Sequence, residues 1–150
     1  MKTTAEAITA VEAAFAETPR PANIDLLHPE CSDDLDIRGL YPIDRWQDVD
    51  DTLVEYEYAA LFFLSPAGFR FFLPAYLRWV LSHPYSEAAV LDSTIRALTP
   101  QPGDLAAFSL SKFTEIEPDE RSAILGFLEA MTVNTEIDLA PAWDYWSSLA

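Results

Sequence analysis

The strongest hydrophobic pattern in the chain spans residues 66–82. Ser65 is a typical N-cap residue, and Pro66 follows at the first helical position, where its missing N–H group costs nothing. Apolar side chains then occupy nearly every face, which is typical of a helix buried on several sides. Pro74 removes one backbone hydrogen bond within this stretch. The pattern therefore predicts a kinked, buried central helix from about residue 66 to residue 82.

Further helices are predicted on both sides of this central helix. Thr3 and Glu6 have the spacing of a capping box, which predicts an N-terminal helix over about residues 4–17. Ser86 is expected to cap a helix that follows the central one, and Pro118 is expected to open a later helix. Each of these segments carries apolar residues at helical spacing, so each predicts one buried face.

Two segments leave the choice between helix and strand open. Residues 51–63 fit both patterns, with helix favoured, and residues 103–114 have a mixed spacing that allows a short strand or a loose turn. The tail, residues 140–146, is expected to form a short helix that docks through its tryptophans. The predicted fold class is mainly α: a single compact domain of about five helices, with at most a short strand or hairpin.

A long acidic and irregular segment is predicted over residues 25–50, which contain proline and glycine. Eleven carboxylates but only two arginines lie between residues 25 and 57. Such a segment can be a solvated face, a docking surface for a basic partner or a site for a divalent cation. We expect one domain over residues 1–150, with its helical core in about residues 51–148.

Composition and charge narrow the classes of function. Half of the 150 residues are apolar, so the chain can bury a core. The formal charge of −16 opposes binding to nucleic acid and to anionic lipid. Residues 61–81 have the length of a membrane span, but two arginines and two prolines within them argue against one. A single cysteine, together with the lack of a recognisable signal peptide, predicts a cytoplasmic protein.

The two arginines of the central helix, Arg70 and Arg78, lie eight residues apart and so share roughly one side of it. Such a pair could hold a carboxylate or phosphate ligand. With 25 carboxylates in the chain, we expect each arginine instead to form a structural ion pair at the edge of the core.

The candidate metal ligands are His28, Cys31 and Asp34. Imidazole, thiolate and carboxylate groups all bind zinc, and these three lie within seven residues. The chain has no second cysteine, so a complete site needs a ligand from elsewhere, such as His83. The acidic neighbours of Cys31 would raise the pKa of its thiol, which argues against a nucleophile. The sequence contains no GxSxG, HExxH or glycine-rich phosphate-binding motif, so an enzymatic activity is not favoured.

The segment Leu64–Tyr76, LSPAGFRFFLPAY, resembles a bacterial family catalogued only as a domain of unknown function, which is marked by an LSPxxFR segment followed by two aromatic residues, LPA and a third aromatic. The stretches Val11–Phe15 and Arg121–Leu128 are similar to helices of that family. The resemblance implies a small soluble bacterial protein and assigns no activity. Members often carry a histidine and two cysteines in the early loop. Here His28 and Cys31 stand in similar places, but an acidic run replaces the second cysteine, which weakens a metal-binding interpretation.

We expect the protein to act by binding another protein. One form of this hypothesis is an inhibitor- or immunity-type protein that neutralises a basic partner. Acidic residues would attract such a partner, and aromatic residues are frequent binding hot spots. The alternative is a metal-binding protein or metal-dependent enzyme with zinc in the His28 and Cys31 loop. The predicted partner-binding residues are Asp33, Asp34, Asp36, Asp48, Asp50, Asp51, Trp143 and Trp146.

Overall fold

The helix α3 (Pro66–Ser82) lies at the centre of the protein, and twelve of its 17 residues are buried. The Ser65 hydroxyl caps the helix by accepting a hydrogen bond from the backbone N–H of Gly68, at 3.0 Å. The helix continues through Pro74 and ends at the C-cap residue His83. The position, the cap and the burial of the central helix are therefore as the sequence predicts.

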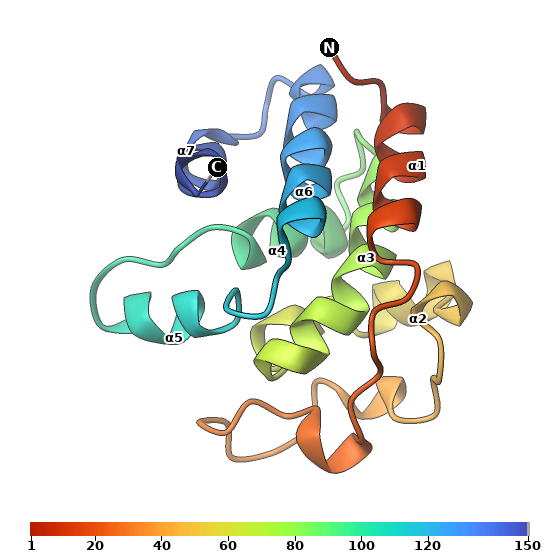
Figure 1. Ribbon diagram of the computed structural model, residues 1–150, viewed down its shortest axis with the longest axis vertical. Coiled ribbons are helices and arrows are strands. Elements are labelled where there is room, and N and C mark those ends of the chain that lie inside the picture. Colours follow the sequence, from red (N-terminus) through yellow and green to blue (C-terminus); the bar gives the residue numbers. More distant parts are fainter. Residues whose placement is uncertain (150) are drawn as a thin grey trace.

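A computed structural model describes residues 1–149, and α3 is surrounded there by six other α-helices (Figure 1). Five of the seven helices have nine or more residues, and the other two have six each. No strand occurs in this part of the chain, where the one β-type contact is an isolated antiparallel bridge between Leu27 and Leu64. The predicted mainly α fold is confirmed. The surrounding helices are α1 (Thr4–Ala14), α2 (Asp51–Tyr56), α4 (Ala89–Ala97), α5 (Ala106–Ser111), α6 (Pro118–Ala130) and α7 (Ala140–Ser148).

The helices α1, α3 and α6 pack against one another and form the body of the fold (Figure 1). The helix α7 lies against α6, and α4 covers another side of α3. Residues 20–50 run beneath this body, at the bottom of the view in Figure 1. Among residues 1–149, no helix has both the length and the apolar character needed to span a membrane.

Some helix boundaries differ from the sequence-based expectation. The N-terminal helix begins with the predicted capping box of Thr3 and Glu6 but ends at Ala14 instead of near residue 17. Pro19 has no N–H group and cannot bond to the Phe15 carbonyl, as another helical turn would require. The Phe15 carbonyl oxygen accepts instead from the indole N–H of Trp46, at 2.8 Å.

Two uncertain segments and one predicted cap are also decided by the structure. Residues 51–63 form α2 and a 3₁₀ turn, and residues 103–114 form a 3₁₀ turn and α5, so both are helical. Ser86 does not cap α4, which begins at Ala89 with Ala88 as its N-cap residue. The Ser86 hydroxyl instead accepts from the N–H of Ala88 in the preceding turn, at 3.0 Å.

The irregular acidic segment is held by arginines that bind backbone carbonyl groups. Arg20 donates to the carbonyl oxygens of Ile43 and Tyr41, at 2.9 and 3.1 Å. Arg78 donates to the carbonyl oxygen of Val49, at 2.8 Å. Because a loop has few partners of its own, these bonds satisfy carbonyl groups that would otherwise be left without a donor. Arg78 therefore has a structural role, but its partners are carbonyl groups and not the carboxylate that the sequence analysis expected.

The start of α3 is joined to the early loop by the residues of the LSP segment. The Ser65 hydroxyl donates to the carbonyl oxygen of Asp25, at 2.6 Å, and the Ser65 N–H donates to that of Leu26, at 2.7 Å. A Cβ atom at Gly68 would lie only 3.1 Å from the Leu26 carbonyl oxygen. The two backbones thus pack closely here and leave little room for a side chain at position 68.

Ser65→Ala is expected to lower the free energy of unfolding by about 1–3 kcal/mol, because it removes both the cap of α3 and the hydrogen bond to Asp25. Urea unfolding followed by circular dichroism measures the change. Ser122→Ala, at an exposed position of α6, is the matched control and should change stability by less than about 0.5 kcal/mol. Equal effects of the two substitutions would contradict the anchoring role of Ser65.

Candidate functional site

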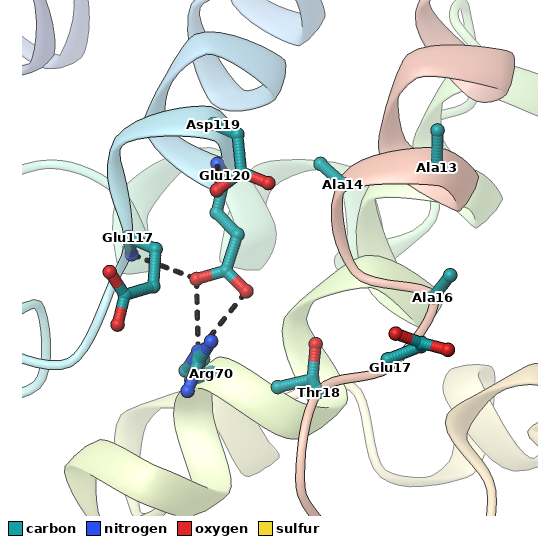
Figure 2. Close-up of a pocket in the computed structure, with 9 residues that line it drawn as sticks. All are labelled: Ala13, Ala14, Ala16, Glu17, Thr18, Arg70, Glu117, Asp119 and Glu120. Carbon is teal, nitrogen blue, oxygen red and sulfur yellow. Dashed lines mark hydrogen bonds and ion pairs between the residues drawn. The ribbon is translucent and has the colours of Figure 1, made fainter.

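A pocket of about 560 Å³ lies between the end of α1, the start of α6 and one side of α3. In Figure 2 the carboxylates of α6 and of its N-cap residue, three in all, stand on one side. The alanines at the end of α1 and just after it stand on the other side, and Arg70 lies at the base. We call this the acidic pocket. Its lining residues are Ala13, Ala14, Ala16, Glu17, Thr18, Arg70, Glu117, Asp119 and Glu120.

The base of the acidic pocket is an ion pair between Arg70 and Glu120. The Arg70 Nε atom lies 2.9 and 3.1 Å from the two Glu120 carboxylate oxygens, and the Glu120 side chain is 2% exposed (Figure 2). Glu120 also accepts from the N–H of Glu117, at 2.8 Å. The hydrogen bond to the Glu120 carboxylate raises the pKa of Arg70. Arg70 thus forms the structural ion pair that the sequence predicted, and its charge is balanced by Glu120.

Three further carboxylates remain around the pocket after this pairing. Glu17, Glu117 and Asp119 are exposed, and none of them forms an ion pair within residues 1–149. On the opposite side, the Ala14 methyl group points toward α6, and Glu17 and Thr18 lie beside the alanines (Figure 2). An ammonium or guanidinium group is the ligand chemistry that this arrangement favours, because carboxylates form strong charge-assisted hydrogen bonds with both.

His28, in the early loop, is buried and has both ring nitrogens in hydrogen bonds. Its Nδ1 atom accepts from the N–H of Glu30, at 3.1 Å, so the proton of the neutral ring is on Nε2. Nε2 lies 2.9 Å from the Ser111 hydroxyl oxygen, which donates in turn to the carbonyl of Phe108. Burial lowers the pKa of His28, which favours this neutral ring. His28 therefore donates to Ser111 and is not placed to remove its proton, so the pair lacks the geometry of a nucleophile and its base.

Lys112 is the charged residue of this region that the sequence analysis missed. Lys112 is only 2% exposed. Its Nζ atom lies 4.8 Å from the ring centre of Phe108 and 5.5 Å from that of Phe62. No hydrogen bond or ion pair to Nζ occurs within residues 1–149. Desolvation by burial lowers the pKa of Lys112 to about 8. The only sequence signal was a lysine directly before the apolar residue Phe113.

The predicted metal ligands do not converge on one point. Asp34 accepts from the Arg38 Nε atom, at 2.7 Å, and from the Tyr41 hydroxyl, at 2.8 Å. Cys31 is half-buried, and burial raises the pKa of its thiol. His83, the possible distant ligand, stacks on the Trp79 ring instead. The part of the chain that the structure describes holds no group of three or more His, Cys, Asp or Glu residues arranged for a metal ion.

The predicted partner-binding residues differ in how much surface they offer. Trp143 is 42% exposed, whereas Trp146 is fully buried and donates its indole N–H to the carbonyl of Leu98, at 2.9 Å. Trp146 is therefore a core residue, and only Trp143 of the two can contact a partner. Asp50 is exposed but also caps α2 by accepting from the N–H of Leu53. The other predicted acidic positions are Asp33, Asp48 and Asp51, which are exposed, and Asp34 and Asp36, which are half-buried.

The stability of the protein is expected to rise with pH through the titration of Lys112. The pKa of this lysine is 10.5 for an ordinary side chain and about 8 in the fold. Between these values the unfolded chain binds more protons than the folded one, so the free energy of unfolding increases with pH, by at most about 3 kcal/mol.

Lys112→Met should remove this increase and should raise stability at pH 7, because an apolar chain of similar length replaces a buried cation. Urea unfolding at several values between pH 7 and pH 10, for both proteins, measures the difference. Lys2→Met, at the other lysine of the chain, controls for the loss of one positive charge. A Lys112→Met protein with the same pH dependence as the wild type would disprove the burial of a cation here.

Comparison with protein families identifies one family model that matches this sequence. A family model described as a family of unknown function, DUF6714, matches residues 3–150. Neither the curated proteins nor the solved structures give a match. The match covers all seven helices of residues 1–149, every lining residue of the acidic pocket and the early loop. The chain belongs to the DUF6714 family.

Proposed function

We propose that the protein binds a basic protein partner and that a lysine or arginine side chain of this partner enters the acidic pocket. The observation that carries the proposal is the pocket itself, in which Glu120 already balances Arg70 and three exposed carboxylates are left over. The Ala14 methyl group gives the aliphatic part of a lysine or arginine side chain an apolar contact. An inhibitor- or immunity-type role toward the partner is one form of this function.

The charge of the whole molecule supports the same partner chemistry. A formal charge of −16 attracts a basic protein at long range and repels nucleic acid and anionic lipid. General attraction is weakened by salt, because exposed charges are screened beyond about 8 Å at physiological ionic strength. A carboxylate beside a pocket can hold a cationic group at short range, where screening has less effect. Specific binding should therefore persist at about 0.15 M salt, at which purely general attraction declines.

The carboxylates of Asp119 and Glu117 are held in place before any ligand arrives. Asp119 accepts from the N–H of Glu120, at 3.0 Å, and Glu117 is the N-cap residue of α6. Thr18, at the rim, donates its hydroxyl to the Phe15 carbonyl. A site whose groups are already ordered loses less conformational entropy when it binds. This favours selective binding over loose attraction to a charged surface.

The test uses a lysine decapeptide as a probe, with its affinity measured by isothermal titration calorimetry at 0.15 M NaCl. The variant Glu117→Gln/Asp119→Asn removes two charges from the acidic pocket and keeps the size of both side chains. It is expected to weaken binding by at least about fivefold, because two charge-assisted contacts become neutral.

The control Glu55→Gln/Asp104→Asn removes the same number of charges from exposed positions outside the pocket. It should weaken binding by less than twofold. Equal losses in the two variants would show that the peptide senses only the overall charge, and the proposal would then be rejected. Circular dichroism of all three proteins confirms that both variants keep the helical fold.

A further inference from the structure

A second pocket, of about 510 Å³, lies between α4, the turn at residues 99–102 and the chain that leads into α7. We call it the α4 groove. It shares no lining residue with the acidic pocket. Its lining residues are Leu91, Asp92, Ile95, Arg96, Thr99, Pro100, Gln101, Pro102, Glu136, Ile137, Asp138 and Pro141.

The floor of the α4 groove is apolar and rigid. Leu91 and Ile95 are four residues apart, so they lie on the same face of α4, and Ile137 faces the groove from the other side. Three prolines form part of its walls, at positions 100, 102 and 141. Because proline has a fixed φ angle, these walls lose little freedom on binding. The floor therefore suits an apolar side chain more than a polar one.

The rim of the groove is acidic. Asp92, Glu136 and Asp138 carry negative charge, and the one basic residue of the lining is Arg96. Arg96 lies 3.9 Å from Asp92, so this pair is close to neutral as a unit. Glu136 and Asp138 remain uncompensated, and both are exposed. Cationic groups on either side of an apolar side chain would complement this rim.

We infer that the α4 groove binds a basic segment of a protein partner by taking up one of its leucine-sized side chains, with flanking lysine or arginine residues at the rim. The inference rests on the proposed function for the basic character of the partner, and it adds the apolar anchor. An apolar centre with a polar rim is the usual arrangement of a protein–protein interface. Nucleic acid and anionic lipid headgroups lack the cationic groups that the rim favours.

Two synthetic peptides test this inference on the full-length protein. One is Lys-Lys-Leu-Leu-Lys-Lys, and the other replaces both leucines by serine, so the two have the same charge. The leucine peptide is expected to bind at least about tenfold more tightly at 0.15 M NaCl, because it alone can bury apolar surface. Amide chemical-shift changes on adding it should include Leu91, Ile95 and Ile137.

Glu136→Lys should weaken binding of the leucine peptide several-fold through repulsion at the rim, and Glu87→Lys, at an exposed position outside the groove, is the matched control. Equal affinity of the two peptides, or shifts confined to other surfaces, overturns the inference. If both peptides bind alike but lose affinity in Glu117→Gln/Asp119→Asn, the acidic pocket holds them and the proposed function stands without the groove. If the leucine peptide shifts the groove residues, and Glu117→Gln/Asp119→Asn binds it as tightly as Glu55→Gln/Asp104→Asn does, then binding in the acidic pocket is rejected and the groove remains.

Discussion

The burial of α3 on every side is the constraint on which the rest of the structure depends. An isolated helix of this composition would expose phenylalanine, tyrosine and tryptophan side chains to water, so other elements must cover it. Helices α1, α4 and α6 cover much of its surface, and α2 and the acidic segment cover further parts. Within residues 1–149, the carboxylate that reaches α3 in an ion pair is that of Glu120, and its partner Arg70 lies at the base of the acidic pocket.

The acidic segment is ordered although it has little regular secondary structure. Its backbone carbonyls need donors once the segment covers the core, and the side chains of Arg20 and Arg78 supply them. Two of the seven arginines are thereby withdrawn from the surface. The exposed side of this segment keeps its excess of carboxylates and adds to the negative charge of the molecule, but it supplies no lining residue of the acidic pocket or the α4 groove.

The acidic pocket and the early loop with His28 differ in how far the sequence reveals them. For the acidic pocket, the ion pair of Arg70 was predicted from the abundance of carboxylates, but its partner lies 50 residues away in the chain. No local pattern connects Ala13 with Asp119, because only the packing of α1 against α6 brings them to one pocket. In the early loop, His28 was identified by its side-chain chemistry. Its hydrogen-bond partner Ser111 and the neighbouring Lys112 come from α5, which had no clear periodicity.

The sequence by itself determined the mainly α fold, the central helix with its Ser65 cap, the capping box at Thr3 and the negative charge. These features depend on neighbours within a few residues or on composition, which local pattern records. The tertiary structure decided that Trp146 is buried while Trp143 is exposed, and that Arg78 binds carbonyl groups. Each of these depends on a contact between segments distant in sequence, because burial and hydrogen-bond partners are set by packing and not by spacing along the chain.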